Sequence, residues 1–274
     1  YRFLSIISEL PPIENSTGLP KVVNISGLFG QSQGRSIYDY YIREWAGVDP
    51  ANGNPMWIEN WSDENNNGQY DSGEGIPDML VYTAENPDAV IEERITNTYS
   101  NATRKYSDKS VIPTVRGAFR LNSSYKGFSL STQFGYSLGG YGYDSQYANL
   151  MTNGKVGGSS YHNDMKDRWM QPGDINDVPR LYSNENVQVV SSSTRFLQST
   201  DYLALNNARL GYQVPSQFLA KTGFSSVNFW VSGDNLFLLS SRQGYNPTTS
   251  LTGQSGRYTY NPISNYTLGV RVKF

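Results

Sequence analysis

Long stretches of this chain alternate between apolar and polar residues, and this period of two limits the folds that it can adopt. In the last ten residues, NYTLGVRVKF (265–274), every second side chain is apolar and the others are polar or small. Successive side chains of a β-strand point to opposite faces, so the pattern predicts one strand with two different faces. We therefore expect an all-β protein built mainly from strands and loops.

A second stretch, RGAFRLNSSYKGFSLSTQFGYSLGG (116–140), alternates in the same way on both sides of Lys126-Gly127. Two alternating segments joined by a tight turn predict a β-hairpin with one apolar face and one small, polar face. Similar patterns predict further strands at 20–30, 36–47, 202–214 and 227–239.

The connections between the expected strands are alternately short and long. They are short at 125–128 and 214–225, and long at 47–113, 139–201 and 240–264. A soluble sandwich has no reason to sort its loops in this way, whereas outer-membrane barrels combine short periplasmic turns with long external loops. The sequence thus predicts part of an antiparallel transmembrane β-barrel with long extracellular loops, its apolar face toward lipid and its polar face toward the lumen.

Composition excludes several other classes of protein. The chain has 22 Lys and Arg against 24 Asp and Glu, with no basic block of the kind that nucleic-acid binding needs. No apolar run approaches the roughly 20 residues of a membrane-spanning helix. The absence of Cys excludes thiolate metal sites, and His162 is the single histidine. Because the chain begins at Tyr1 without an initiator Met, we expect a mature or partial chain.

The segment DENNNGQYDSGE (63–74) has the spacing of a twelve-residue calcium loop. Such a loop would brace the long 47–113 connection, which we expect to have little core of its own. The alternative is a solvated Asn/Gly turn, which is common in exposed loops. The predicted ligands are the side chains of Asp63, Asn65, Asn67, Asp71 and Glu74 and the carbonyl of Gln69.

Other candidate residues lie in the long connections. His162, Asp164 and Asp167 are close together in sequence, but no nucleophile motif supports catalysis, and a solvated loop explains them better. Loops carry recognition, so tyrosines there could contact a substrate or a partner protein. The candidates are Tyr143, Tyr147, Tyr161, Tyr245, Tyr258 and Tyr260.

Four segments carry a family resemblance. The most specific are STRFLQSTDYLALNNARLGYQVP (193–215) and VSGDNLFLLSSRQGYNP (231–247). The other two are WAGVDPANGNPMWI (45–58) and DRWMQPGDINDVPRL (167–181). Together the four segments, which stand in family order, resemble the SusC-like TonB-dependent outer-membrane transporters of Bacteroidetes. Asn246 stands where the family usually has Asp, so a role for that carboxylate is not expected here.

The resemblance implies that residues 1–274 are the C-terminal strands of a 22-stranded barrel, with the N-terminal plug domain absent. It implies TonB-dependent import of an oligosaccharide or peptide across the outer membrane, driven by the proton gradient, and no enzymatic activity. The expected partners are a SusD-like surface lipoprotein, the TonB complex through the plug, and outer-membrane lipid. Phe274, which closes an alternating strand, resembles the signal by which such barrels are handed to their insertion machinery.

Two alternatives remain open from the residues alone. The chain could be a small autonomous outer-membrane barrel that serves as an adhesin or passive pore, although even the smallest needs eight strands. It could also be a soluble, calcium-dependent, carbohydrate-binding β-sandwich, which would explain the calcium loop and the tyrosines but not the alternation of loop lengths.

Overall fold

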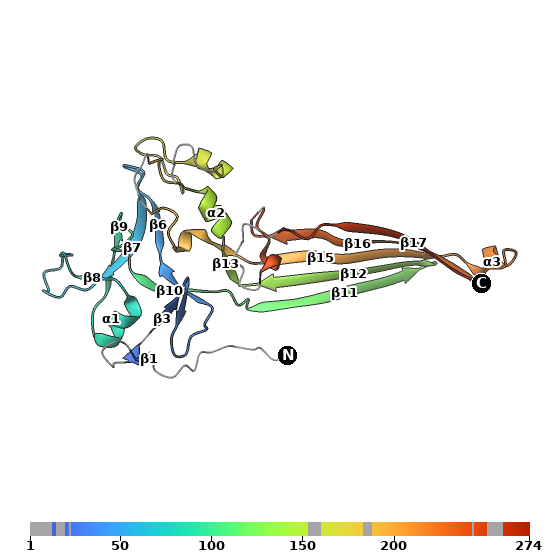
Figure 1. Ribbon diagram of the computed structural model, residues 1–274, viewed down its shortest axis with the longest axis horizontal. Coiled ribbons are helices and arrows are strands. Elements are labelled where there is room, and N and C mark those ends of the chain that lie inside the picture. Colours follow the sequence, from blue (N-terminus) through green and yellow to red (C-terminus); the bar gives the residue numbers. More distant parts are fainter. Residues whose placement is uncertain are drawn as a thin grey trace. The chain divides into compact units, whose positions relative to one another are not determined.

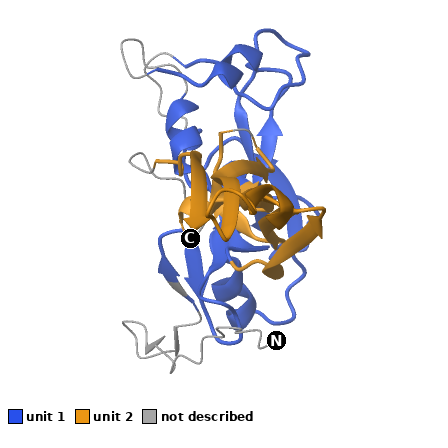
Figure 2. Cartoon of the chain, turned by 90° about the vertical axis from the view of Figure 1, so that its right-hand side faces the viewer, with its two compact units in different colours: residues 1–111, 143–197 blue, residues 112–142, 198–274 orange. Residues whose placement is uncertain are grey.

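The computed structural model describes residues 13–14, 20–21, 23–152, 160–182, 188–242, 244–250 and 260–274. These residues form antiparallel β-sheets with a few short helices, which confirms the predicted all-β class (Figure 1). The chain divides into two compact units (Figure 2). Unit 1 comprises residues 1–111 and 143–197, and unit 2 comprises residues 112–142 and 198–274. Within the described ranges, no helix is long and apolar enough to cross a membrane.

Unit 2 is one five-stranded antiparallel sheet in the order β11-β12-β15-β16-β17 (Figure 1). Its strands are β11 (Val115–Tyr125), β12 (Phe128–Leu138), β15 (Tyr202–Gln213), β16 (Ser226–Ser240) and β17 (Asn265–Lys273). These match the strands predicted at 116–138, 202–214, 227–239 and 265–274. The helix α3 (Ser216–Leu219) lies in the short connection between β15 and β16.

The turn between β11 and β12 has the predicted tight geometry. Lys126 and Gly127 both have positive φ, 47° and 86°, as two-residue hairpin turns of the primed type require. A Cβ on Gly127 would lie 2.9 Å from the backbone oxygen of Gln213, so glycine is needed here for space as well as for conformation.

The sheet of unit 2 has two chemically different faces. Directly opposite residues of antiparallel strands share a face, and the register places Phe119 opposite Phe134 and Leu130 opposite Leu210. The apolar side chains on this face are exposed, Leu268 to 79% and Leu130 to 45%. They include Phe119, Leu121, Tyr125, Phe128, Leu130, Leu138, Leu210, Phe229, Val231, Phe237, Leu239, Tyr266, Leu268 and Val270. The other face carries Ser, Asn, Gln and Arg, as the alternation predicts.

The strand register of this sheet shifts on both sides of β15, where two of the family-like segments lie next to each other. The register shifts between Gln133 and Phe134 on one side of β15 and between Leu205 and Asn207 on the other. Each shift is a β-bulge, in which an extra residue on one strand lacks a direct partner. The bulge keeps Leu205 and Leu210 on the same apolar face, although five positions separate them and strict alternation would put them on opposite faces.

Local chemistry stabilises this bulge. Asn207 donates through Nδ2 to Asp234 Oδ1 (2.7 Å), and Asn235 adopts a left-handed conformation with φ 52°. A Cβ on Gly233 would lie 2.4 Å from Leu236 Cδ2, so a larger residue there would displace the Leu236 side chain beside the bulge. Residues 203–207 and 232–236, which belong to the two most specific family-like segments, therefore form the two sides of this one bulge.

Unit 1 contains smaller antiparallel sheets. One has the order β10-β5-β4-β3, and in another β7 pairs with β6, β8 and β9. The strands of the first are β3 (Asn24–Ser26), β4 (Phe29–Gln31), β5 (Asp39–Arg43) and β10 (Arg104–Ser110); those of the second are β6 (Trp45–Val48), β7 (Pro55–Trp61), β8 (Gly75–Ile76) and β9 (Glu92–Thr96). Further short pairs are β1 (Ile13–Glu14) with β2 (Pro20–Lys21) and β13 (Tyr141–Tyr143) with β14 (Leu197–Ser199). The helical segments are α1 (Met79–Glu85), α2 (Ser145–Leu150), η1 (Asn163–Asp167), η2 (Thr194–Phe196) and, in unit 2, η3 (Pro247–Thr249).

The single strand expected at 36–47 is instead two strands that belong to different sheets. β5 ends at Arg43, and β6 begins at Trp45. The reason is long-range: the Trp45 backbone N–H donates to Thr194 Oγ1 (3.0 Å), and the Glu44 carbonyl accepts from Ile58 N–H (3.0 Å). Because residues 44 and 45 form hydrogen bonds with these other segments, the backbone leaves the hydrogen-bond ladder of β5 at this point.

The 47–113 connection has a core, contrary to the expectation of a loop with little packing of its own. Trp57 and Ile76 are each 1% exposed. The buried Thr103 hydroxyl accepts from Asn60 N–H (2.7 Å) and donates to the Ile76 carbonyl (2.6 Å). These contacts join segments that lie 27 to 43 residues apart, so periodicity within the connection could not reveal them.

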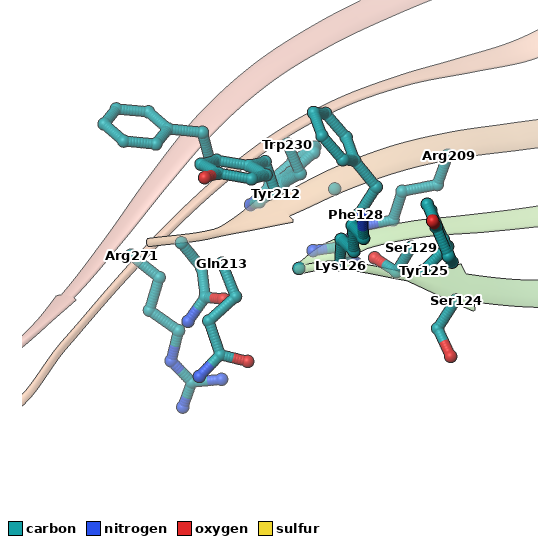
Figure 3. A pocket seen from close by; sticks show the side chains of 14 residues that line it. Ser124, Tyr125, Lys126, Phe128, Ser129, Arg209, Tyr212, Gln213, Trp230 and Arg271 are labelled. Carbon is teal, nitrogen blue, oxygen red and sulfur yellow. The ribbon is translucent and has the colours of Figure 1, made fainter. Parts of the chain in front are cut away.

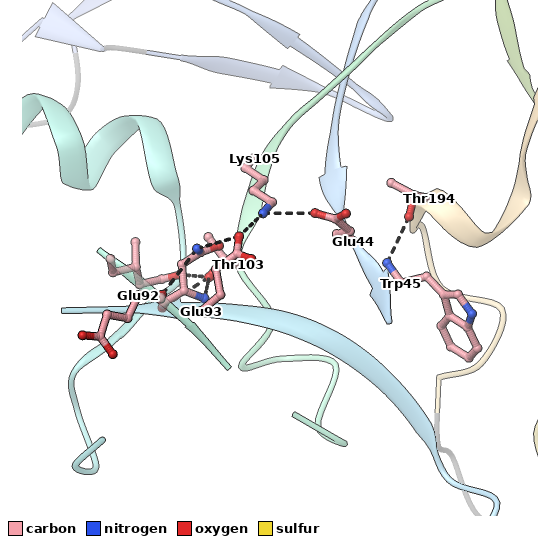
Figure 4. A network of polar contacts seen from close by, with 9 residues as sticks. Glu44, Trp45, Glu92, Glu93, Thr103, Lys105 and Thr194 are labelled. Carbon is pink, nitrogen blue, oxygen red and sulfur yellow. Dashed lines mark hydrogen bonds and ion pairs between the residues drawn. The ribbon is translucent and has the colours of Figure 1, made fainter. Parts of the chain in front are cut away.

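An ion-pair network ties the two sheets of unit 1 together (Figure 4). Lys105 Nζ lies 2.9 Å from Glu93 Oε1 and 3.0 Å from Glu44 Oε2. Hydrogen bonds from Lys105 and Asn60 lower the pKa of Glu93. Burial by itself would lower the pKa of Lys105, but its two carboxylate partners outweigh burial and raise it. The network therefore favours a negatively charged Glu93 and a positively charged Lys105 at the junction of β9 and β10.

Candidate functional site

The predicted calcium loop, Asp63–Glu74, is held closed by its own hydrogen bonds. Asp63 accepts N–H groups from Asn67 (3.0 Å) and Gly68 (2.7 Å). Glu74 is buried and accepts from the backbone N–H groups of Glu64 (3.2 Å) and Asp71 (2.7 Å). Gly68, the sixth residue of the loop, has a φ of 74° and makes a sharp turn there.

Two of the predicted ligands are turned toward a third. The Nδ2 groups of Asn65 and Asn67 each donate to Asp71 Oδ2 at 2.7 Å, and the Gln69 N–H donates to Asn67 Oδ1 (2.7 Å). Among the described residues, no three His, Cys, Asp or Glu side chains gather as a metal site. The loop thus has a closed backbone without an assembled carboxylate cage, and calcium binding stays a prediction.

Tyr70 ties the loop to neighbouring strands. Its hydroxyl donates to Glu59 Oε1 (3.0 Å), its ring meets Trp61 edge-on with 5.8 Å between ring centroids, and the Arg94 guanidinium lies 3.7 Å from its centroid. Burial, followed by the hydrogen bond to Glu59, raises the pKa of the Tyr70 hydroxyl. The middle of the loop is therefore tied to β7 and β9.

The calcium prediction is tested by proteolysis in calcium and in chelator. Calcium should protect residues 50–110 of the wild type, at the 10⁻⁴ to 10⁻³ M level that is typical of extracellular sites. Glu74→Gln should lose this protection. That substitution also weakens two backbone hydrogen bonds, so cutting of the variant in chelator is the baseline against which its response to calcium is read. Equal cutting of the wild type in calcium and in chelator would contradict the prediction.

The His162 region is an ordered polar cluster in unit 1. His162 caps η1, where its Nδ1 accepts from Asp164 N–H (3.2 Å). The Tyr147 hydroxyl donates to Asp164 Oδ2 (2.8 Å), and the Tyr147 ring meets the imidazole edge-on at 4.9 Å between centroids. These contacts give each group a structural role.

A pocket of about 700 Å³ opens beside this cluster. Its walls combine Tyr147 with acidic, basic and apolar side chains from residues 164–178. They include Tyr147, Asp164, Lys166, Asp167, Arg168, Met170, Asp174, Ile175 and Asp177. Met170 and Ile175 are 64% and 94% exposed. Of the five predicted tyrosines that the structure describes, Tyr147 is the one that lines this pocket.

The remaining predicted tyrosines divide by burial. Tyr143 and Tyr245 are 6% and 4% exposed, so both pack inside the protein. Burial raises the pKa of the Tyr143 hydroxyl. Tyr161 and Tyr260 are exposed, to 42% and 92%, and can meet a ligand or partner directly. Tyr258 lies outside the described residues.

Arg195, in the first of the most specific family-like segments, has a role that sequence reasoning missed. The Arg195 guanidinium lies 4.7 Å from the Trp45 ring centroid and 5.0 Å from that of Phe196, and its Nη1 donates to the Val189 carbonyl (2.9 Å). Burial lowers the pKa of Arg195 to about 10. The residue packs η2 against β6, and its contact with Trp45 has no local signal in the sequence because Trp45 is far away along the chain.

The other two family-like segments lie against each other in unit 1. The Trp169 indole N–H donates to the Pro50 carbonyl (3.0 Å), and the Arg180 N–H donates to the Gly53 carbonyl (3.1 Å). A Cβ on Gly53 would lie 2.5 Å from the Trp169 ring. The glycine therefore allows the 167–182 segment to dock on the turn before β7.

Phe274 lies beside the connection that contains α3. Its ring meets Phe224 edge-on at 5.2 Å between centroids, its carbonyl accepts from the Ser225 hydroxyl (3.2 Å), and 87% of the residue is exposed. An accessible terminal ring is compatible with the expected assembly signal, which stays a prediction.

Searches for similar proteins agree on one class of relatives. No family model matches the chain. It is 26% identical over 182 residues to "TonB-dependent receptor P3" and 28% identical over 141 residues to "TonB-dependent receptor P39", both from Formosa agariphila. These alignments cover 61% and 51% of this chain but only 17% and 14% of the relatives. The chain thus spans a small part of the length of the proteins it matches, none of which is named as an enzyme.

Solved structures show the same fold. The RagAB peptide transporter matches with a TM-score of 0.68 and 22% identity over 94% of this chain and 25% of the other. The closed-closed state of the RagAB peptide importer matches with a TM-score of 0.70 and 21% identity, over 93% and 25%. At this level of identity the likeness establishes the fold. Together, these comparisons show that the chain is similar in sequence to TonB-dependent receptors and shares its fold with a segment of the RagAB peptide transporter.

Proposed function

We propose that this chain forms part of the barrel wall and external loops of a transporter in the outer membrane that imports an oligomeric nutrient, glycan or peptide, by a TonB-dependent mechanism. The observation that carries the proposal is the exposed apolar face of the unit 2 sheet. Water would penalise so many exposed large apolar side chains, whereas hydrocarbon lipid favours them. Strands β11 and β17 are the edges of the sheet, and they would pair with further strands of the wall.

Partner and cargo follow from the relatives. RagAB pairs a transporter with a surface lipoprotein, so we expect a SusD-like lipoprotein to cooperate with this protein and TonB to energise it. The description of RagAB as a peptide transporter favours a peptide over a glycan as the cargo. The accessible Tyr161 and Tyr260 are the residues from which we expect contact with the cargo or the lipoprotein.

Uptake of a labelled oligomer by cells that carry the intact full-length gene tests the proposal. Uptake should be lost when the gene is deleted and also when a protonophore collapses the proton gradient. Uptake that needs the gene but resists the protonophore would indicate a passive pore instead. Recovery of the protein from the soluble fraction would favour the β-sandwich alternative.

A further inference from the structure

Unit 2 carries a strong excess of positive charge that the whole chain does not. Residues 112–142 and 198–274 contain nine of the 22 Lys and Arg but only two of the 24 Asp and Glu. Both of those carboxylates are already hydrogen-bonded: Asp201 Oδ1 accepts from Gly139 N–H (2.6 Å), and Asp234 Oδ1 accepts from Asn207 (2.7 Å). Neither forms an ion pair with a basic residue among the described parts of the chain.

The basic residues of the strands lie on the polar face. Arg120 pairs with Gln133, Arg209 with Ser131 and Ser232, and both are flanked in sequence by residues of the apolar face. By the same register the polar face also holds Arg116, Arg271 and Lys273. In the transporter this face looks into the lumen.

The four arginines form a ladder along the strands. Arg120 is four residues beyond Arg116 in β11. Arg209 is level with Asn122 across the strands, which is two residues beyond Arg120. Arg271 is level with Gln213, which is four residues beyond Arg209. At about 3.4 Å per residue, successive arginines are about 7 to 14 Å apart along the strand direction. The ladder therefore reaches from the end with long connections to the end with short turns.

A pocket of about 510 Å³ lies at the short-turn end of this ladder (Figure 3). Arg209 and Arg271 both line it, together with Lys126, Gln213 and Trp230. The walls combine three cations and hydrogen-bonding amides and hydroxyls with aromatic side chains, among them Tyr125, Phe128, Tyr212 and Phe229, and contain no Asp or Glu.

The aromatic ring that the pocket holds on the polar face, Trp230, is already covered. The Arg209 guanidinium lies 4.4 Å from the Trp230 ring centroid, and a Cβ on Gly269 would lie 2.3 Å from the indole, which covers that glycine. Trp230 is therefore not a free platform for stacking a sugar ring. On the polar face, the pocket presents the guanidinium groups of Arg209 and Arg271, and the planar fork of a guanidinium binds a carboxylate through two hydrogen bonds.

From these observations, and resting on the proposed function, we propose that the polar face selects acidic cargo: peptides rich in Asp and Glu that pass along the ladder of Arg116, Arg120, Arg209 and Arg271. Rings and rows of Arg or Lys give anion selectivity in other membrane pores because they replace the hydration of the anion and raise its local concentration. Several separate arginines, rather than one deep site, let a carboxylate move from one to the next. A neutral oligomer would gain nothing from them.

The test compares two fluorescent peptides in cells that carry the full-length transporter and its lipoprotein. The peptides are identical except that one carries glutamates and the other glutamines. We expect the wild type to take up the glutamate peptide faster, and Arg209→Gln/Arg271→Gln to lower the ratio of the two rates about tenfold, as loss of charged hydrogen bonds predicts. Arg209→Lys/Arg271→Lys should largely restore the ratio. Lys221→Gln, which removes an exposed cation from the connection after α3, should leave it unchanged. Rates are normalised to the amount of inserted protein.

Each other result has a definite meaning. Equal rates for the two peptides in the wild type, or an unchanged ratio in the double Gln variant, would overturn acidic selection while leaving import intact. Entry of neither peptide would count against import itself. Preferential entry of an oligoglucuronate without a preference for the glutamate peptide would overturn the assignment to peptides. A lower unfolding temperature of the double Gln variant with an unchanged ratio would show that the arginines stabilise the transporter and do not select its cargo, which also overturns the proposal.

Discussion

Leu130→Arg in the full-length protein should reduce the amount of transporter in the outer membrane at least tenfold. Leu130 lies in the inner strand β12 with its side chain on the exposed apolar face, in one row with Leu210, Val231 and Leu268. An arginine that faces lipid costs about 2–4 kcal/mol at the middle of the membrane and less toward its interfaces, and Leu130 is the third residue of β12 after the short turn. Immunodetection of the protein in purified outer membranes measures the effect.

The neighbouring residue supplies a matched control. Ser131 is next in the same strand but points to the polar face, opposite Arg209 and Asn122. Ser131→Arg adds the same side chain on the lumen side and should insert at close to the wild-type level. Equal insertion of the two variants would mean that the apolar face does not meet lipid, and the proposed membrane location would fail with it.

Phe196→Ala should loosen the 143–197 part of unit 1. Phe196 is fully buried and packs against Tyr143 and Tyr147, with ring centroids 6.1 and 6.0 Å away, and beneath Arg195. Truncating a buried Phe to Ala costs about 3–5 kcal/mol because it removes apolar contacts and leaves a cavity. Hydrogen exchange of the full-length protein should show faster exchange in peptides that cover 143–152 and 188–197.

Phe196→Leu is the control for this substitution. It keeps most of the apolar volume, so its cost should be small and exchange should stay close to that of the wild type. The strands of unit 2 should exchange equally in both variants, which would separate a local effect from a failure of assembly. Unchanged exchange in Phe196→Ala would show that this cluster does not stabilise unit 1.

The sequence alone determined the strands of the wall. Their apolar and polar residues alternate because the two faces meet different surroundings, and side chains of a strand change face at every residue. This local rule located the hairpin with its Lys126-Gly127 turn, the strands 202–214 and 227–239, and the last strand. The family-like segments added the identity of the relatives, which periodicity could not provide.

Only the tertiary structure decided what lies between those strands. The break at Glu44 depends on Thr194, the core of the 47–113 connection depends on Thr103, and the burial of Tyr143 depends on Phe196. The β-bulge beside Asn207, which shifts the alternation by one, and the arginine ladder, whose members come from three strands, depend on cross-strand register. Spacing along a chain encodes the geometry of one element. Contacts between residues distant in sequence arise only when separate elements pack, and for that reason no local pattern in this sequence could reveal them.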